Sequence, residues 1–528
     1  MKLIPIFLCA LVVLGAPAFG AGVPVGKPNV LVILADDQGW GDLSVNGNTN
    51  LATPHVDSLA SAGAMFDRFY VCPVCSPTRS EFLTGRYHPR SGVFNVSTGG
   101  ERMSLAEKTI ADTFKAAGYA TGAFGKWHNG MQYPYHYVPF NSPHTPAQVP
   151  DRFYSKFAHL TLTMRDRDPE RENVDKTRAI LAMCENVDWN VGRLLQKLDA
   201  LKLADNTIVI YFSDNGPNGW RWNGGMKGRK GSVDEGGVRA PFFIRWPGRI
   251  PGGAKISKIA GAIDLLPTLA DLAGIPVVSA KPLDGVSLKP LLLGGAKDRP
   301  DRMIFSHWAG KVSVRTQRHR FVVPGQLFDM VADPGQDRNV AKEQPEVAAR
   351  LSSAVEKWKG ELLPSLGKQE WPFTVGYREL PITQLPARDG VPHGNVKRSA
   401  RAPNCSFFTN WTSADDRITW DVEVATAGRY EAVVYYTCPK ADTGSVIEIG
   451  FNGSRIEASV SEAHNPPLRG QEHDRFPREG ESLVKDFKPM RLGVMDLKPC
   501  RGELTLRALK VSGKTVMDVR LILLTLVK

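Results

Sequence analysis

Carboxylate and amide side chains follow two strand-like runs of this 528-residue sequence. Asp36 and Asp37 come directly after the first run, and Asp214 and Asn215 follow the second with one serine between. In a parallel sheet both pairs emerge at the carboxyl edge, where open α/β folds bind ligands. Three carboxylates that converge there repel one another without a cation, which predicts a hard divalent ion, Ca²⁺ or Mg²⁺. Either pair alone is better explained as a cap or turn after its strand.

A cysteine-containing loop offers a second kind of chemistry. It reads Cys-Ser-Pro-Thr-Arg from Cys75 to Arg79, and another cysteine, Cys72, stands three positions earlier. A cysteine-dependent phosphatase needs an arginine six positions after its nucleophile. Counted from Cys75 this position holds Glu81, and counted from Cys72 it holds Thr78, so that class of enzyme is excluded. From the residues alone, the other interpretation of Cys75 is a buried or disulfide-bonded thiol.

The elements that must position these groups alternate between strand-like runs and helix patterns in the first half of the chain. Such alternation is typical of an α/β domain with a largely parallel sheet. We expect strands at 29–35, 119–124 and 207–212. We expect three helices. One begins at Thr53-Pro54, and a second begins at the capping box Ser104-x-x-Glu107 and ends near Gly118. The third follows the apolar repeat from Ile180 to Leu198.

The pattern changes after residues 366–402, which are poor in periodicity and which we interpret as a linker. Residues 403–528 hold short runs rich in aromatic and β-branched residues. Asn452-Gly453 between two runs predicts a hairpin, and Ser512-Gly513 a further turn into the last strand. We therefore predict a separate all-β sandwich of jelly-roll type. If it binds carbohydrate, exposed aromatic side chains such as Trp411 or Tyr436 stack on the sugar; the commoner role of such residues is to fill the core.

Composition and charge limit the possible partners. The net charge of +12 and the pI near 9.3 favour anionic partners. We find no nucleic-acid-binding motif, so we expect no nucleic acid partner. Residues 1–21 combine Lys2, a short apolar stretch and small residues, as a cleaved secretory signal does, and no other stretch resembles a membrane span. We expect an exported protein, periplasmic or secreted. The sequence leaves open which of Cys405, Cys438 and Cys500 form a disulfide.

Several short motifs follow one another in a specific order between residues 28 and 360, although each is weak alone. They are Asp36-Asp37, Cys75-Ser76-Pro77-Thr78-Arg79 with Thr84-Gly85-Arg86, Gly125-Lys126-Trp127-His128, Pro143-His144-Thr145-Pro146, Ser213-Asp214-Asn215-Gly216, Lys230-Gly231-Ser232 leading into Glu235-Gly236-Gly237, Asp264-Leu265-Leu266-Pro267-Thr268 and Leu327-Phe328-Asp329. Together they resemble the formylglycine-dependent (type I, arylsulfatase A-like) sulfatases of the alkaline phosphatase superfamily. The resemblance implies an alkaline-phosphatase-like, mainly parallel sheet flanked by helices, in a catalytic domain over 22–365.

The resemblance also implies a modified residue and a metal. A separate maturation system would oxidise Cys75 to formylglycine (3-oxoalanine). Asp36, Asp37, Asp214 and Asn215 would hold the metal, Ca²⁺ or alternatively Mg²⁺, together with an oxygen of the modified Cys75. The hydrated aldehyde would attack sulfur while the metal neutralises sulfate charge.

The remaining roles fall, by the same resemblance, to basic residues. Arg79 and Lys126 would hold and polarise the hydrated aldehyde, and Lys230 would contact the sulfate. His144 would protonate the leaving oxygen, and His128 would help to remove a proton so that sulfate is expelled. Lys126, His144 and Lys230 would thus also bind substrate.

The chain departs from the family pattern between His128 and His144. Only residues 129–143 stand there, where the family has a much longer stretch, so we interpret the chain as internally shortened. The function that we predict is a sulfatase acting on sulfated carbohydrate. One alternative is a phosphonate or phosphodiester hydrolase that uses the same aldehyde and metal, and the other is a catalytically impaired glycan-binding protein.

Overall fold

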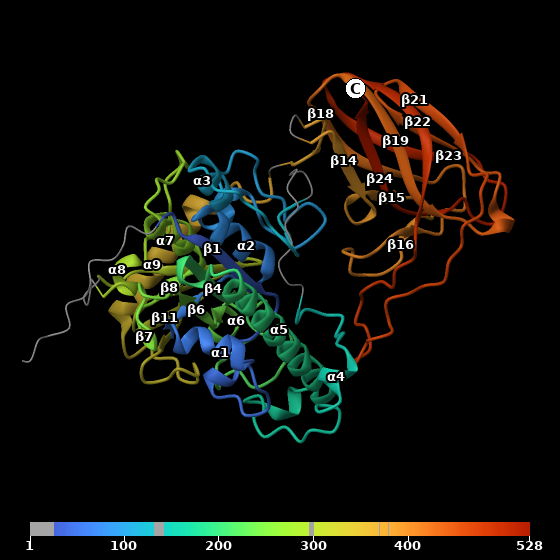
Figure 1. Cartoon of the computed structure of the whole chain (residues 1–528). Helices are drawn as coiled ribbons and strands as arrows, with labels where there is room; N and C mark the ends of the chain where they lie inside the picture. The colour runs from blue at the N-terminus through green and yellow to red at the C-terminus, as the bar shows by residue number, and fades with distance from the viewer. Residues whose placement is uncertain (1–25, 131–141, 295–299, 369, 378–379, 528) are drawn as a thin grey trace, which may run out of the picture.

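The chain forms two parts in the computed structural model, which describes residues 26–130, 142–294, 300–368, 370–377 and 380–527. Figure 1 shows an α/β part, coloured blue to yellow, and a C-terminal β part, coloured orange to red. The predicted signal segment 1–21 lies outside the described residues. Within them, every helix is too short or too polar to cross a membrane.

The central sheet of the α/β part has the strand order β1-β4-β6-β2-β7. The strands β1 and β4 are parallel, with Ala35 opposite Ser213, and β2 and β7 are also parallel, whereas β6 runs antiparallel to both of its neighbours. The sheet is therefore mixed, and the predicted parallel arrangement holds for the pair that carries the acidic residues. The strands are β1 (Asn29–Ala35), β2 (Ala64–Phe66), β4 (Thr207–Ser213), β6 (Phe242–Arg245) and β7 (Ala254–Ile256).

Helices cover both faces of this sheet, and for that reason β4 is an uninterrupted apolar run. Its Val209 and Tyr211 pack with α1 (Pro54–Ser61) and α5 (Val174–Ala200), while Ile210 and Phe212 pack with residues of α2 and α7 on the other face. Every residue of β4 is buried, as expected for a strand between two helical layers. The helices of the second face are α2 (Cys75–Thr84), α3 (Ile110–Ala116) and α7 (Leu265–Ala273), and the short helices α4 (Asp151–Tyr154) and α8 (Lys289–Leu292) lie at the periphery (Figure 1).

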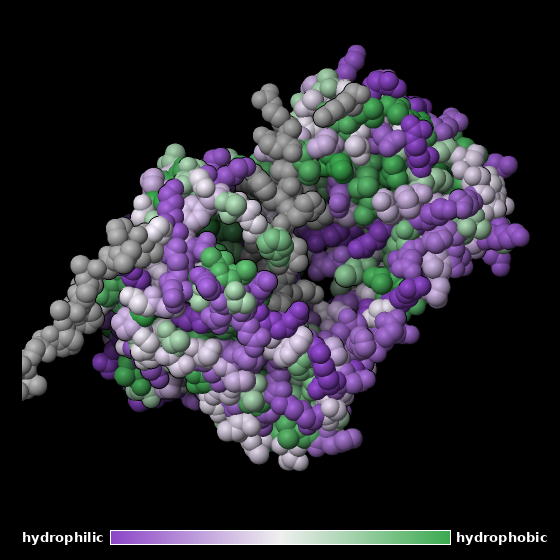
Figure 2. Space-filling model, viewed as in Figure 1, coloured by the Kyte–Doolittle hydropathy of each residue, from purple (hydrophilic) through white to green (hydrophobic). Residues whose placement is uncertain are grey.

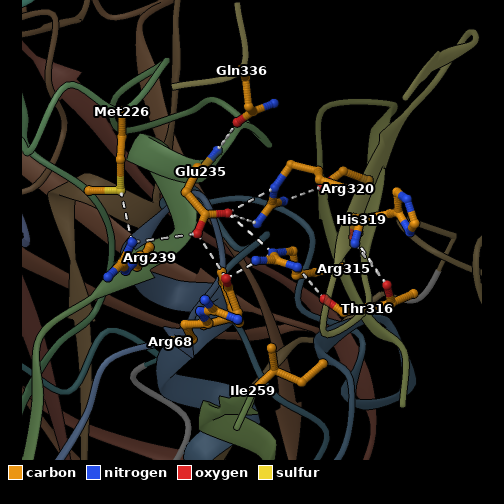
Figure 3. Close-up of polar contacts among 12 residues, drawn as sticks. Arg68, Met226, Glu235, Arg239, Ile259, Arg315, Thr316, His319, Arg320 and Gln336 are labelled. Atoms are coloured by element: carbon orange, nitrogen blue, oxygen red, sulfur yellow. Dashed lines mark hydrogen bonds and ion pairs between the residues drawn. The ribbon is translucent and has the colours of Figure 1, made fainter. Parts of the chain in front are cut away.

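A second, antiparallel sheet of four strands follows in the α/β part. Its order is β12-β11-β10-β9, and α9 (Pro345–Leu362) packs on it. Figure 3 shows how it is joined to the short helix α6 (Glu235–Val238): Arg315 and Arg320 of this sheet converge on the carboxylate of Glu235. The remaining strands of this part are β3 (Phe69–Tyr70), β5 (Arg239–Ala240), β8 (Ala260–Gly261), β9 (Ile304–Trp308), β10 (Lys311–Arg315), β11 (His319–Val322) and β12 (Gln326–Asp329).

The C-terminal part is a sandwich of two six-stranded sheets, which we call the β module (residues 373–527). One sheet has the order β13-β18-β23-β20-β21 with β15 beside β18, and the other has the order β16-β17-β24-β19-β22 with β14 beside β24. The strands are β13 (Phe373–Val375), β14 (Ile382–Pro386), β15 (Val391–His393), β16 (Lys397–Arg398), β17 (Phe408–Thr409), β18 (Arg417–Val424), β19 (Gly428–Thr437), β20 (Val446–Phe451), β21 (Ser454–Ser459), β22 (Lys488–Leu497), β23 (Arg501–Lys510) and β24 (Asp518–Val527).

Several predictions for the β module need correction. The stretch 366–402, predicted as a linker, contributes β13 to β16 to the two sheets. These strands have two to five residues, too few to produce a readable alternation, and only their pairing defines them. The predicted hairpin at Asn452-Gly453 is present, but the strands on either side of Ser512-Gly513 lie in opposite sheets. Trp411 and Tyr436 are each 1% exposed and fill the core, which is the commoner of the two roles considered for them. The pairing of Cys405, Cys438 and Cys500 was left open by the sequence, and all six described cysteines are free.

Two predictions for the α/β part are also wrong. Residues 119–124 form no strand, and Phe124 is 77% exposed, because no described strand pairs with this run or covers it. The helix predicted from Ser104-x-x-Glu107 begins at Ile110 instead, after a capping box between Thr109 and Asp112. Glu107 does not cap the helix because its buried carboxylate is ion-paired with Lys281 at 2.8 Å.

The β module contacts the α/β part through the segment 461–487. Figure 1 shows this orange segment reaching down to α4. Gln148 pairs with Asp474 in an isolated bridge, and the backbone N–H of Arg475 donates to the carbonyl of Ala147 at 2.8 Å. A second contact joins Arg388 of the module to the buried Glu101.

Candidate active site

The acidic residues meet because their strands are adjacent and parallel. Asp36 and Asp37 follow β1, and Asp214 and Asn215 follow the end of β4. The backbone N–H of Asp37 donates to Oδ1 of Asp214 at 3.1 Å, and Nδ2 of Asn215 donates to Oδ1 of Asp37 at 2.9 Å. All four residues are at most 1% exposed, so three carboxylates are concentrated in a space that water barely reaches.

Cys75 lies against this cluster at the start of α2. Its Sγ and carboxylate oxygens of Asp36 and Asp214 all lie within 4.8 Å of one another. Thr78 fixes this position: its hydroxyl donates to the carbonyl of Asp214 at 2.6 Å and accepts the N–H of Cys72 at 2.8 Å. Burial raises the pKa of the Cys75 thiol, so an unmodified Cys75 is a poor nucleophile here.

Arg79 joins the acidic cluster to the next motif along the chain. Its Nε and Nη2 both donate to Oδ2 of Asp214, at 2.9 and 2.7 Å, so one carboxylate oxygen accepts two charge-assisted hydrogen bonds. Nη1 donates to the carbonyl of Lys126 at 2.6 Å, and Nη2 lies 3.8 Å from Oδ2 of Asp36. Arg79 is fully buried and therefore holds the site together from below.

Three basic side chains cover the opening above the acidic cluster. The ammonium group of Lys126 is ion-paired with Asp36, and that of Lys230 lies 2.5 Å from Oδ1 of Asp37. Nε2 of His144 lies 3.6 Å from Oδ2 of Asp37, and its Nδ1 faces the carbonyl of Thr145. These side chains are 12, 17 and 19% exposed, whereas Cys75 is 1% exposed. An anion that approaches Cys75 therefore meets these basic groups first.

The charges shift the pKa values of the carboxyl groups in opposite directions. Burial alone would raise the pKa of Asp36, but the charge of Lys126, with those of His144 and Arg79, lowers it to about 2. The pKa of Asp37 is lowered as well, because Lys230 outweighs the effect of burial. Burial and the neighbouring charge of Asp36 raise the pKa of Asp214 to about 7 in spite of Arg79. The raised pKa of Asp214 means that a third negative charge in the cluster is unfavourable, and a bound cation would offset it.

The donor atoms of the cluster fit a hard divalent cation. Three buried oxygens have no hydrogen-bond donor within the described residues: Oδ1 of Asp36, Oδ2 of Asp37 and Oδ1 of Asn215. Buried oxygens without a donor are costly, and a Ca²⁺ or Mg²⁺ ion among them removes that cost. The set holds carboxylate and amide oxygens with one sulfur and no close imidazole pair, which disfavours zinc.

Of the two predicted histidines, only His128 makes no hydrogen bond or ion pair to this cluster among the described residues. Its Nε2 faces the carbonyl of Val96, so Nε2 carries the proton, and its Nδ1 has no hydrogen-bond partner in that part of the chain. Burial lowers the pKa of His128 well below its usual value, and the charge of Lys126 adds to this effect. The ring is therefore neutral, with an unoccupied lone pair on Nδ1.

Sequence reasoning assigned no role to three residues that position the site. Asn129 donates from Nδ2 to the carbonyl of Ser76 at 3.1 Å and so holds the start of α2. Arg221 donates to the carbonyl of Asp37 at 3.1 Å while it is ion-paired with the buried Asp42 at 2.5 Å. Glu235 anchors the loop that carries Lys230. Asn129 follows the His128 motif directly, but nothing local marks Arg221, because its partner lies far away in the sequence.

Comparison with family models matches most of the α/β part. The model described as "Sulfatase" matches residues 28–135 and 133–275, two segments that meet at 133–135. The model described as "N-sulphoglucosamine sulphohydrolase, C-terminal" matches residues 229–360. Together they cover all ten residues of the predicted site, and they end before the β module.

Known proteins with similar sequences and structures are sulfatases. Arylsulfatase A of Homo sapiens is 32% identical over 417 residues, which cover 61% of this chain and 81% of that protein. N-acetylgalactosamine-6-sulfatase of Canis lupus familiaris is 29% identical over 369 residues, 55% of this chain and 71% of that protein. The solved structure "Ps i-CgsB in complex with k-i-k-neocarrahexaose" superposes with a TM-score of 0.58 at 26% identity, covering 64% of this chain and 94% of that chain.

Proposed function

The chain belongs to the formylglycine-dependent sulfatase family and is a sulfuric ester hydrolase, and from this premise we propose that it removes sulfate esters from sulfated carbohydrates. The observation that carries the proposal is the convergence of Cys75, Asp36 and Asp214 within 4.8 Å beneath Lys126, His144 and Lys230. A buried nucleophile position under basic groups suits a substrate whose reacting group is an anion.

Three observations support carbohydrate as the substrate class. A structural neighbour at 26% identity is described in complex with a neocarrahexaose, and a curated relative is named for N-acetylgalactosamine-6-sulfate. The charge of +12 also favours a polyanionic substrate over an aryl sulfate with a single negative charge. The phosphonate or phosphodiester hydrolase stays as the alternative, and relative rates on sulfate and phosphate esters separate the two.

The mechanism that we propose assigns the nucleophile to Cys75 after its oxidation to formylglycine, whose hydrate supplies a hydroxyl group for attack on sulfur. A Ca²⁺ or Mg²⁺ ion held by Asp36, Asp37, Asp214 and Asn215 would supply positive charge at the sulfate oxygens. Arg79 orients Asp214 and, through the Lys126 carbonyl, the loop of Lys126. Lys126 and Lys230 hold the sulfate by its oxygens, because the transition state spreads negative charge that fixed cations stabilise.

Two histidines move protons in this proposal. His144 donates one to the bridging oxygen as the sugar alcohol leaves; burial lowers its pKa, which makes its protonated form a stronger acid. His128 accepts a proton at Nδ1, the ring nitrogen that has no hydrogen-bond partner in the described part of the chain. After transfer of the sulfate group to residue 75, the proton would come from the hydroxyl that remains there, so that the C–O bond to sulfate breaks and the aldehyde forms again.

We also propose that the chain is exported and internally shortened. The residue pattern of 1–21 supports export. The family model is matched in two segments that overlap at 133–135, which supports the loss of a family segment between His128 and His144. Most of the stretch concerned, 131–141, lies outside the described residues.

The test of the proposed function starts with the tryptic peptide 69–79 of protein made in its own host or in a maturation-competent one. Mass spectrometry is expected to find Cys75 with CHO in place of CH₂SH. Protein that carries the aldehyde is then expected to hydrolyse 4-nitrophenyl sulfate, and the Cys75→Ala variant is expected not to. A wholly unmodified thiol, or an aldehyde-bearing protein without sulfate release, would overturn the proposal.

A further inference from the structure

A cavity of about 250 Å³ lies where the α/β part and the β module meet. Three segments form it: the residues at the start of α5, the loop after β4, and the 461–487 segment of the β module. On the face shown in Figure 2, hydrophilic residues predominate where the two parts meet. The lining residues that matter here are Arg171, Lys176, Trp220, Arg229 and, from the β module, Glu479.

The cavity wall concentrates positive charge around one aromatic ring. The guanidinium carbons of Arg171 and Arg229 lie 3.8 and 4.9 Å from the centre of the Trp220 ring. The face of a tryptophan ring attracts cations, which offsets the repulsion between two guanidinium groups brought to the same ring. The ring is therefore occupied by arginine and does not serve as a stacking platform for a sugar.

Little negative charge compensates these arginines. Arg171 has Asp168 as a partner at 3.6 Å, but both side chains are more than half exposed, so the pair contributes little. Arg229 forms no ion pair with a carboxylate among the described residues. Lys176 is paired with Glu479 at 2.8 Å, and Glu479 is 52% exposed. The cavity thus has guanidinium donors free to bind an anion.

The same loop forms this cavity and the active site. Arg229 directly precedes Lys230, whose ammonium group lies 2.5 Å from Asp37, and Trp220 follows the metal-ligand candidate Asn215 by five positions. The backbone N–H of Lys230 donates to the carbonyl of Pro217 at 3.1 Å, which closes the loop on itself. An anionic group in the cavity and a sulfate ester at Cys75 can therefore belong to the same glycan chain.

We propose that this cavity is a second anion subsite, which binds a sulfate or carboxylate group on another sugar of the same glycan chain. The inference rests on the proposed function, and it narrows the substrate class to carbohydrates with more than one anionic group. Guanidinium groups suit this task because they bind tetrahedral and planar oxyanions through two parallel N–H donors. Glu479 limits affinity, since its carboxylate competes for Lys176 and repels the incoming anion.

The test measures how well two oligosaccharides inhibit hydrolysis of 4-nitrophenyl sulfate, a substrate with a single anionic group. A carrageenan oligosaccharide supplies several sulfates, and an oligogalacturonate supplies carboxylates alone. For the oligosaccharide that uses the subsite, Arg171→Gln is expected to raise the inhibition constant about tenfold, because one charged hydrogen-bond donor is lost. Glu479→Gln is expected to lower it.

A matched control comes from a similar arginine stack on α5, away from the cavity. Arg193 lies over the Trp189 ring at 4.8 Å, outside the cavity, and Arg193→Gln is expected to leave both inhibition constants unchanged. Calorimetric binding of the same oligosaccharides to each variant gives a second readout that needs no turnover. Equal affinity in the parent, Arg171→Gln and Glu479→Gln proteins would overturn the subsite, whereas failure to hydrolyse 4-nitrophenyl sulfate would count against the proposed function alone.

Discussion

The substitution Glu235→Gln tests the attachment of the active-site loop to the second sheet. Glu235 lies five residues after Lys230, and its carboxylate is 2% exposed. Its Oε2 accepts a hydrogen bond from Nη2 of Arg320 at 2.8 Å and lies 3.5 Å from Nε of Arg315 (Figure 3). Its Oε1 accepts a hydrogen bond from the hydroxyl of Tyr70 at 2.8 Å. Glutamine has nearly the same shape but no charge, so it leaves two buried guanidinium groups without a counter-ion.

The expected loss of stability is about 3 kcal/mol, the lower end of the range for breaking a buried ion pair, because the amide oxygen still accepts one hydrogen bond. The pKa of Glu235 supports this magnitude. Burial would raise the pKa, but Arg320 and Arg315 outweigh burial and lower it from 4.5 to about 2. A shift of that size corresponds to about 3 kcal/mol.

The sign of the pH dependence follows from the lowered pKa. The stabilisation is fully present above pH 4.5, the ordinary value, and is lost as the pH falls towards 2, because the proton binds the unfolded chain more tightly. Glu235→Gln has no such group, so its stability is expected to fall less than that of the parent between pH 5 and pH 2.

Urea unfolding followed by intrinsic fluorescence measures both effects. The control is Glu343→Gln, which removes a carboxylate from the exposed pair with Arg338 and is expected to change stability by less than about 1 kcal/mol. A loss below about 1 kcal/mol for Glu235→Gln at pH 7, or an acid dependence equal to that of the parent, would refute the reasoning.

Three further predictions concern the metal, the sulfate and the β module. Removal of divalent cations with EDTA is expected to lower the Tm, and added Ca²⁺ to restore it, because Asp36, Asp37 and Asp214 repel one another without a cation. Asp36→Asn is expected to reduce this response. A Tm of the parent protein that does not change with Ca²⁺ would exclude the metal site. Lys230→Ala is expected to raise the KM for 4-nitrophenyl sulfate at least about tenfold because a charge-assisted contact is lost, and an unchanged KM in steady-state kinetics would remove Lys230 from sulfate binding. Trp420→Ala is expected to lower the free energy of unfolding of the β module by about 3–5 kcal/mol, measured in urea. The reason is that Trp420 is 1% exposed in the core and donates a hydrogen bond to the carbonyl of Pro386 at 3.0 Å. A change near zero would show that the core closes around the smaller side chain without leaving a cavity.

The sequence alone was sufficient to predict the acidic cluster. Strands buried on both faces have continuous apolar sequences, so β1 and β4 can be recognised at 29–35 and 207–213, and their acidic residues come directly after them. The long helix α5 was predictable for a similar reason, because its apolar residues repeat every three to four positions. The order of short motifs then indicated the family that the comparisons support.

Tertiary structure decided what depends on partners far apart in the chain. The strands within 373–398 exist because β18, β17 and β24 pair with them, and the run 119–124 remains outside the sheet because no described strand covers it. Glu235 meets Arg320 across 85 positions, and the cavity joins residues 171–180, 218–229 and 479. A local pattern records which side of an element is buried, whereas these contacts arise only when sheets and loops close on one another, and therefore they cannot be read from periodicity.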